Sequence, residues 1–172
     1  SQITLENPPE GELEAFLEVY RKMGGQYKGN SGKLLVNGEH VQKPVELLET
    51  AVYPGFPTDL QSPVMAVLAT VKGRSCIREN VFEDRYKAAQ QLVKMGADIR
   101  VQGKEAVIHG GKELHGAIVT AWELRGGAAL ILGALCVKGV TVLDGYSYVQ
   151  RGYEHICQDL NTLGAAVKRI QE

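Results

Sequence analysis

Residues 59–101 read DLQSPVMAVLATVKGRSCIRENVFEDRYKAAQQLVKMGADIRV, and their landmarks return in the same order in residues 123–170, ELRGGAALILGALCVKGVTVLDGYSYVQRGYEHICQDLNTLGAAVKRI. Val71-Lys72-Gly73, for example, recurs 66 residues later as Val137-Lys138-Gly139. Upstream, residues 13–38 resemble only the second half of this stretch. Self-similarity at a fixed period indicates a fold assembled from copies of one supersecondary unit that stack to bury a shared core.

Each complete unit is predicted to run helix, strand, helix, strand, strand. The first helix is apolar nearly all round, at residues 64–71 in one copy and 128–137 in the other, which predicts burial on every side. Cys136 falls inside the second of these helices and is therefore expected to be buried. The second helix of each unit is amphipathic and stops at a glycine, Gly96 or Gly164, where a left-handed C-cap is expected. Short alternating segments follow and predict strands with one exposed face.

Helices with no polar face and sheets with one apolar face predict an α/β fold with the helices inside and the sheets outside. This arrangement inverts the usual layering of α/β proteins. We expect a partial unit at residues 1–50 and two fuller units at residues 51–115 and 116–172. The partial unit starts at its amphipathic helix, near residues 9–23, so we expect its buried helix to lie before Ser1 in a longer parent protein.

The composition excludes several functional classes. The chain has 172 residues, enough for one domain or slightly more, and 19 Lys and Arg against 20 Asp and Glu leave a formal net charge of −1. This balance argues against nucleic-acid binding and against a polybasic membrane anchor. The longest apolar run, residues 128–137, is about half as long as a membrane span. Three widely spaced cysteines favour a reducing compartment, and four histidines without metal-ligand spacing predict no metal site.

Asp59 lies where a Pro- and Gly-rich approach, residues 53–58, meets the buried helix of its unit. One interpretation is an N-cap, because an aspartate at that point satisfies free backbone N–H groups. The other is a general base, a carboxylate held by a rigid loop and able to take a proton from a substrate hydroxyl. Both interpretations stay open, since capping does not exclude catalysis.

Arg125 occupies the equivalent position in the next unit and is followed by two glycines. A cation is unfavourable at a helix N-terminus, so this arginine indicates an anion shared between the guanidinium and free N–H groups, which the glycines would make accessible. A pair with Glu123 or another acid is the alternative. Arg151 is predicted to begin the last amphipathic helix, where it would be either a second anion-binding arginine or a solvated surface residue.

At these positions the sequence resembles the C-terminal part of the UDP-N-acetylglucosamine 1-carboxyvinyltransferase family, the UDP-GlcNAc enolpyruvyl transferases. The resemblance runs from about Leu13 to the C-terminus, and PGFPTDLQ together with RGYE is its most specific part. The stretches that carry it are PGFPTDLQ (54–61), ENVFEDRY (79–86), MGAD (95–98), ELRGGAAL (123–130), RGYE (151–154) and LGA (163–165).

The resemblance implies an inside-out α/β barrel in which repeated units place buried helices within mixed four-stranded sheets. Members of the family have two such domains, with the active site in the cleft between them. They transfer the enolpyruvyl group of phosphoenolpyruvate to the 3-hydroxyl of UDP-N-acetylglucosamine and release phosphate. This is the committed step of peptidoglycan synthesis in the bacterial cytoplasm, on which cell-wall growth, cell shape and division depend. It needs no metal and no cofactor.

The resemblance also implies roles for individual residues. Asp59 matches the aspartate that contacts the sugar and is the candidate base, and Val81 matches a position whose backbone contacts the UDP-sugar. Arg125 and Arg151 match arginines that bind phosphoenolpyruvate or its phosphate. Glu123 matches a position usually occupied by aspartate and implicated in proton handling, and its extra methylene moves the carboxylate by about a bond length, a change to which catalysis is sensitive.

The family's Lys-Asn pair and its mobile loop with a reactive cysteine match no part of this chain. We therefore expect the chain to form one wall of a two-walled active site, to be inactive alone and to need the N-terminal domain of the same enzyme. Two alternatives are a sister transferase of the 5-enolpyruvylshikimate-3-phosphate synthase type and a non-catalytic relative that binds UDP-sugars. The sugar-side sequences argue against the first, and Glu123 favours the second.

Overall fold

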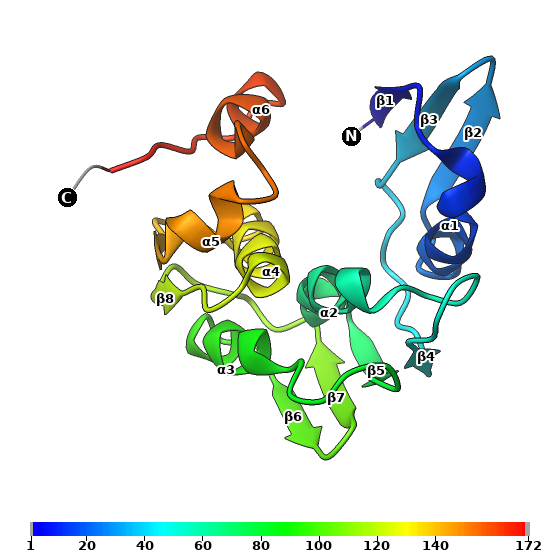
Figure 1. Cartoon of the computed structure of the whole chain (residues 1–172). Helices are drawn as coiled ribbons and strands as arrows, with labels where there is room; N and C mark the ends of the chain where they lie inside the picture. The colour runs from blue at the N-terminus through cyan, green and yellow to red at the C-terminus, as the bar shows by residue number, and fades with distance from the viewer. Residues whose placement is uncertain (1, 171–172) are drawn as a thin grey trace.

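The computed structural model describes residues 2–170, and Figure 1 shows their arrangement. The helices are α1 (Glu14–Lys22), α2 (Gln61–Thr70), α3 (Lys87–Lys94), α4 (Leu124–Leu135), α5 (Tyr146–Gln150) and α6 (Ile156–Thr162), with short 3-10 helices η1 (Glu10–Glu12) and η2 (Thr58–Leu60). The strands are β1 (Gln2–Glu6), β2 (Gln26–Asn30), β3 (Lys33–Asn37), β4 (Leu48–Glu49), β5 (Gly73–Arg78), β6 (Ile99–Gln102), β7 (Glu105–Gly110), β8 (Ile118–Thr120) and β9 (Val142–Asp144).

The strands form three sheets that are pieces of one pattern. The middle sheet has the order β4-β5-β7-β6, with β4 parallel to β5 and the other pairs antiparallel. The first sheet, β1-β3-β2, is wholly antiparallel and corresponds to β5-β7-β6. The last sheet, β8-β9, is parallel and corresponds to β4-β5, with α4 as its connecting helix in place of α2. The same strand pairing therefore recurs along the chain, and its fullest copy is the middle sheet, whose edge strand β4 lies within the segment 1–50 that was predicted to be the first unit.

The helices α2 and α4 pack against each other in the interior, and the sheets lie around them (Figure 1). Side chains on several faces of α2 are buried, as expected for a helix without a polar face. Its Met65 and Leu68 are fully buried in a core shared with Ile77 and Ile108 of the sheet and with Leu130 of α4. The predicted α/β class is therefore confirmed, and in this part of the molecule two apolar helices pack against each other and against the middle sheet.

The amphipathic helices of all three units end in the same way. Gly24, Gly96 and Gly164 have φ values of 101°, 97° and 95°, in the left-handed region that favours glycine. In each case the following residue donates its N–H to a carbonyl five residues back, at 2.9, 3.1 and 3.0 Å, which completes a Schellman motif. The predicted C-caps at Gly96 and Gly164 are confirmed.

The third unit differs from its prediction. Its amphipathic helix, expected to begin at Arg151, is only α6, which begins at Ile156; a further short helix, α5, precedes it. No strand follows α6 within residues 2–170, and the last sheet has two strands. Helix α4 ends at Leu135, and Cys136 is its exposed C-cap, so the prediction of a buried Cys136 is wrong. The physical reason is that an apolar helix is buried only where a sheet covers it, and two strands leave this end of α4 uncovered.

Candidate active site

The site predicted from the sequence lies at the N-terminal ends of α2 and α4. Asp59 belongs to η2, directly before α2, and Arg125 lies in the first turn of α4. The Nε group of Arg125 donates a hydrogen bond to the Asp59 carboxylate, and the two residues form an ion pair. They are 66 residues apart, which is the offset of the repeat. Because α2 and α4 pack together, equivalent positions of two successive units meet in one site.

The pair is accessible from solvent. The Asp59 side chain is 58% exposed and the Arg125 side chain 34%, so a ligand can reach both. The hydrogen bond to Asp59 raises the pKa of Arg125 above its ordinary value, which keeps the guanidinium charged. The alternative weighed for Arg125, a pair with a nearby acid, is what the structure shows, and the acid is Asp59.

The capping interpretation of Asp59 is wrong, and the role belongs to Glu123. Asp59 makes no capping hydrogen bond at η2 or α2. The side chain of Glu123, the N-cap of α4, instead accepts from the N–H groups of Arg125, at 2.9 Å, and of Gly126. A carboxylate at this point also compensates the positive end of the helix.

The two glycines after Arg125 do not open the backbone to an external anion. A Cβ on Gly126 would lie 2.6 Å from the Glu123 carboxylate, and a Cβ on Gly127 would lie 2.4 Å from the Val149 side chain. Both glycines are buried. They permit the Glu123 cap and the close packing of α5 on α4, so the prediction of an anion cradle at these N–H groups is wrong.

Arg151 also differs from its prediction. It is the exposed C-cap of α5, not the first residue of a helix, and a cation is favourable at that end. The neighbouring Gly152 lies against Leu124 at the start of α4, which brings Arg151 to the same end of α4 as Arg125. Within residues 2–170, no hydrogen bond or ion pair joins Arg151 to Asp59 or Arg125.

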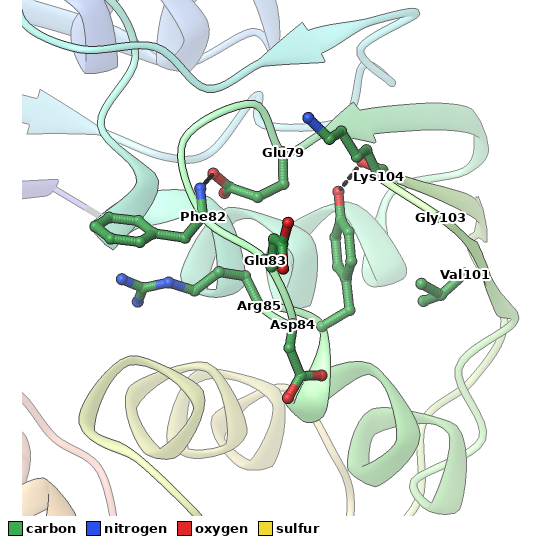
Figure 2. Close-up of a pocket in the computed structure, with 9 residues that line it drawn as sticks. Glu79, Phe82, Glu83, Asp84, Arg85, Val101, Gly103 and Lys104 are labelled. Carbon is green, nitrogen blue, oxygen red and sulfur yellow. Dashed lines mark hydrogen bonds between the residues drawn. The ribbon is translucent and has the colours of Figure 1, made fainter.

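Val81 lies in the loop between β5 and α3, and a buried carboxylate organises that loop (Figure 2). Glu79, only 2% exposed, accepts hydrogen bonds from the N–H groups of Val81, at 2.9 Å, and of Phe82, at 3.0 Å. The Val81 N–H is thereby occupied, which leaves its carbonyl oxygen as the backbone group for a ligand. The Arg85 guanidinium lies 4.4 Å from the centroid of the Phe82 ring and braces the same loop.

Glu79 was not among the site residues predicted from the sequence. The alternation of the strand could have indicated it, because side chains at every second position of a strand lie on the same face. Glu79 follows Ser75 and Ile77 on the buried face of β5, where a carboxylate is out of place unless it is hydrogen-bonded.

Two hollows in the described part of the chain are lined by other residues than the ion pair. A cavity of about 300 Å³ is lined by the loop from Glu79 to Tyr86 and the turn between β6 and β7. A shallow groove of about 1230 Å³ follows α4, β9, α5 and α6. Neither is lined by Asp59 or Arg125, whose side chains are partly exposed.

Residues 2–170 contain no cluster of three or more His, Cys, Asp or Glu side chains arranged to hold a metal ion. In the same part of the chain, every helix is too short or too polar to cross a membrane.

Comparison with known families gives one consistent result. A sequence model described as EPSP synthase (3-phosphoshikimate 1-carboxyvinyltransferase) matches residues 1–160. A UDP-N-acetylglucosamine 1-carboxyvinyltransferase of Desulfofundulus thermocisternus is 41% identical over 167 residues, which cover 97% of this chain and 68% of that protein. A second such enzyme, from Clostridium tetani, is 40% identical over 99% of this chain but only 40% of its own length. The chain therefore spans about 40% of some curated relatives.

Solved structures agree on the fold. The enolpyruvyl transferase NikO from Streptomyces tendae matches 98% of this chain and 40% of its own, with a TM-score of 0.86 and 26% identity. EPSP synthase from Acinetobacter baumannii matches 99% of this chain with a TM-score of 0.74, and its 19% identity supports the fold alone. The repeated units, the site between equivalent helix ends and these matches agree, and the chain belongs to the UDP-N-acetylglucosamine 1-carboxyvinyltransferase family of enolpyruvyl transferases.

Proposed function

We propose that this chain forms one wall of an active site that transfers the enolpyruvyl group of phosphoenolpyruvate to the 3-hydroxyl of UDP-N-acetylglucosamine. The observation that carries the proposal is the exposed Asp59–Arg125 pair, which places a base and an anion-binding group side by side in a chain of this family. The other wall comes from the second domain of the same enzyme. The product would enter peptidoglycan synthesis in the bacterial cytoplasm.

Asp59 is the proposed base. It accepts a proton from the 3-hydroxyl as that oxygen bonds to the enolpyruvyl carbon, and phosphate leaves as the other product. For this, a hydroxyl must come within about 3 Å of the carboxylate. The 58% exposure of the Asp59 side chain supports this role, because an oxygen left open by Arg125 is accessible to the sugar.

Arg125 is the proposed ligand for phosphoenolpyruvate. Its bond to Asp59 uses Nε, and no other hydrogen bond of this guanidinium occurs within residues 2–170. The two Nη groups are thus available for a carboxylate or phosphate, for which the planar guanidinium is well suited. Arg151 is the proposed second anion ligand, because the neighbouring Gly152 lies against Leu124 at the start of α4.

Val81 and Glu123 complete the proposed wall. The Val81 carbonyl contacts the UDP-sugar, because its N–H is occupied by Glu79. Glu123 holds the backbone of Arg125 through its cap and so fixes the start of the anion-binding turn. Direct proton handling by Glu123 would require this cap to open.

The test is a graft that replaces the matching segment of an active UDP-GlcNAc enolpyruvyl transferase with this chain. Phosphate release from phosphoenolpyruvate is measured with UDP-N-acetylglucosamine and, separately, with shikimate 3-phosphate. We expect release with the UDP-sugar alone, and a loss of about 100-fold or more for Arg125→Ala. Arg100→Ala, which removes an 80% exposed arginine far along β6, is the matched control and should keep full activity.

Release with shikimate 3-phosphate would contradict the proposed sugar substrate and favour the activity of the sister transferases. A folded graft that binds the UDP-sugar without releasing phosphate would indicate the non-catalytic alternative, which the capping role of Glu123 favours. In that case Glu123→Asp is the next variant, because it restores the residue usual in the family.

A further inference from the structure

We propose that Glu79 is a positioning residue that holds the turn carrying Asp59 and the loop carrying Val81 in one fixed arrangement. The inference rests on the proposed function, because it concerns two segments of the same wall. Glu79 itself is 2% exposed and therefore acts through the residues it binds, not on the substrate.

The two carboxylate oxygens of Glu79 serve different segments. Oε1 accepts from the Thr50 hydroxyl at 2.8 Å and from the N–H groups of Val81 and Phe82 at 2.9 and 3.0 Å. Oε2 accepts from the Thr58 hydroxyl at 2.8 Å. Thr58 is the residue before Asp59 in η2. One side chain therefore joins the proposed base-bearing turn to the proposed sugar-binding loop, and Figure 2 shows its bond to Phe82.

Thr50 fixes Glu79 in turn. Thr50 is fully buried directly after β4, and its N–H donates to the carbonyl of Arg78 at 3.0 Å. Its hydroxyl oxygen also accepts from the Asn80 N–H at 2.9 Å. The backbone on both sides of Glu79 is thus tied to the edge of the sheet, so the carboxylate has a rigid base from which to hold Thr58.

The charge of Glu79 is balanced by hydrogen bonds alone. No Lys or Arg forms an ion pair with Glu79 among the residues that the structure describes. A buried carboxylate without a cation is costly unless several donors point at it. Burial on its own would raise the pKa of Glu79, yet the bonds from Phe82, Thr50, Val81 and Thr58 lower it below its ordinary value. The Glu79 carboxylate is therefore held and stabilised by the positions of its hydrogen-bond donors, not by an ion pair.

This geometry separates substitutions that keep the arrangement from those that destroy it. In Glu79→Gln the amide oxygen keeps the three donors at Oε1, and the NH2 group donates to the Thr58 oxygen, which reverses that bond without removing it. Glu79→Leu removes all four bonds. Thr58→Val removes only the connection to the Asp59 turn, and Thr70→Val is its matched control, since Thr70 makes a local bond to Val67 at the far end of α2.

The first measurement is kcat and KM for UDP-N-acetylglucosamine in the graft described above. Thr58→Val should lower kcat about 10-fold or more and leave KM within twofold of the parent. The reason is that it frees the turn that carries Asp59 but leaves the loop that carries Val81 bound to Glu79. Glu79→Leu should also raise KM, Glu79→Gln should keep KM within about threefold of the parent, and Thr70→Val should change neither constant. A role in folding alone would lower the yield of folded enzyme without this division between kcat and KM.

The second measurement separates this inference from the proposed function. Amide hydrogen exchange at Val81 and Phe82 is followed in the 172-residue chain, which needs no substrate. Glu79→Leu should speed exchange at both amides about 10-fold or more, and Glu79→Gln should not. A folded graft that releases no phosphate with UDP-N-acetylglucosamine would contradict the proposed function. Faster exchange of the Val81 and Phe82 amides in Glu79→Leu would still support the positioning role. Unchanged protection in Glu79→Leu, or equal kinetic effects of Thr58→Val and Thr70→Val, would overturn the inference.

Discussion

The second and third units carry the same sequence landmarks, but the amphipathic helix of the second unit is more deeply buried than that of the third. Helix α3 of the second unit packs against α4 and β6 and buries Ala88, Ala89, Gln91 and Leu92. Helix α6, its equivalent in the third unit, has no fully buried residue. Both helices end in the same Schellman motif. The difference shows that local chain signals set where a helix ends, whereas the neighbouring sheet decides whether the helix is buried.

The largest effect should come from deleting equivalent leucines. Leu92 is fully buried in α3, whereas Leu160, its counterpart in α6, is only half-buried. Leu92→Ala should lower the free energy of unfolding by about 2–5 kcal/mol, because it leaves a cavity in the core. Leu160→Ala should cost less than about 1 kcal/mol, and urea denaturation of both variants measures the difference. Equal losses would show that the third unit is packed as tightly as the second.

A smaller contrast is expected at the two capping glycines. Gly96→Ala and Gly164→Ala both place a side chain at positive φ, which costs about 1–2 kcal/mol. The new Cβ at position 96 would also lie 3.1 Å from the His115 ring, while position 164 has no neighbour within 4 Å. Thermal denaturation should therefore show the larger decrease in melting temperature for Gly96→Ala. The reverse order would contradict the packing assigned to the second unit.

A pH-dependent contrast is expected at Glu79, which has no counterpart in the third unit. Because its folded-state pKa is lowered, Glu79 stabilises the protein above its ordinary pKa of about 4.5. This contribution is lost as the pH falls through the lowered folded-state value. The stability difference between the parent and Glu79→Gln should thus be larger at pH 7 than at pH 3 in urea denaturation. Thr70→Val removes a hydrogen bond but no titrating group, and its deficit should not follow this pattern.

The smallest effect on stability is expected at the ion pair between the units. Asp59 and Arg125 are partly exposed, and such pairs contribute at most about 1 kcal/mol. Asp59→Asn should therefore leave the unfolding free energy nearly unchanged while it lowers the activity of the graft. A loss of several kcal/mol in urea denaturation would mean that the pair serves to join the units and not to act on a substrate.

Much of the fold was predictable because its signals are local. The repeated landmarks, the apolar helices and the capping glycines at positions 96 and 164 are written in short stretches of sequence. The exposure of Cys136 and the late start of α6, at Ile156, were not predictable in this way. Both depend on which strands cover a helix, and that is a property of the assembled sheets.

The site was predictable in part for the same reason. Asp59 and Arg125 were identified from their equivalent positions, and the packing of α2 on α4 brings them together. Their pairing could not be deduced, because the crossing of two buried helices has no local signal. Asp59 makes no cap because it lies within the 3-10 turn at residues 58–60 and Leu60 is the N-cap of α2, whereas Glu123 is itself the N-cap of α4. Arg151 was misplaced because the last amphipathic helix, α6, begins only at Ile156, and Arg151 is instead the C-cap of α5.

The most direct test of the central claim is a double-mutant cycle on kcat/KM for UDP-N-acetylglucosamine in the graft. The claim is that equivalent residues of two units form one functional pair, so Asp59→Asn and Arg125→Lys should not be additive. We predict that kcat/KM of the double variant is at most about threefold below that of the less active single variant. The reason is that either single change already disrupts the pair. Losses that multiply fully would show two independent residues and would contradict the account.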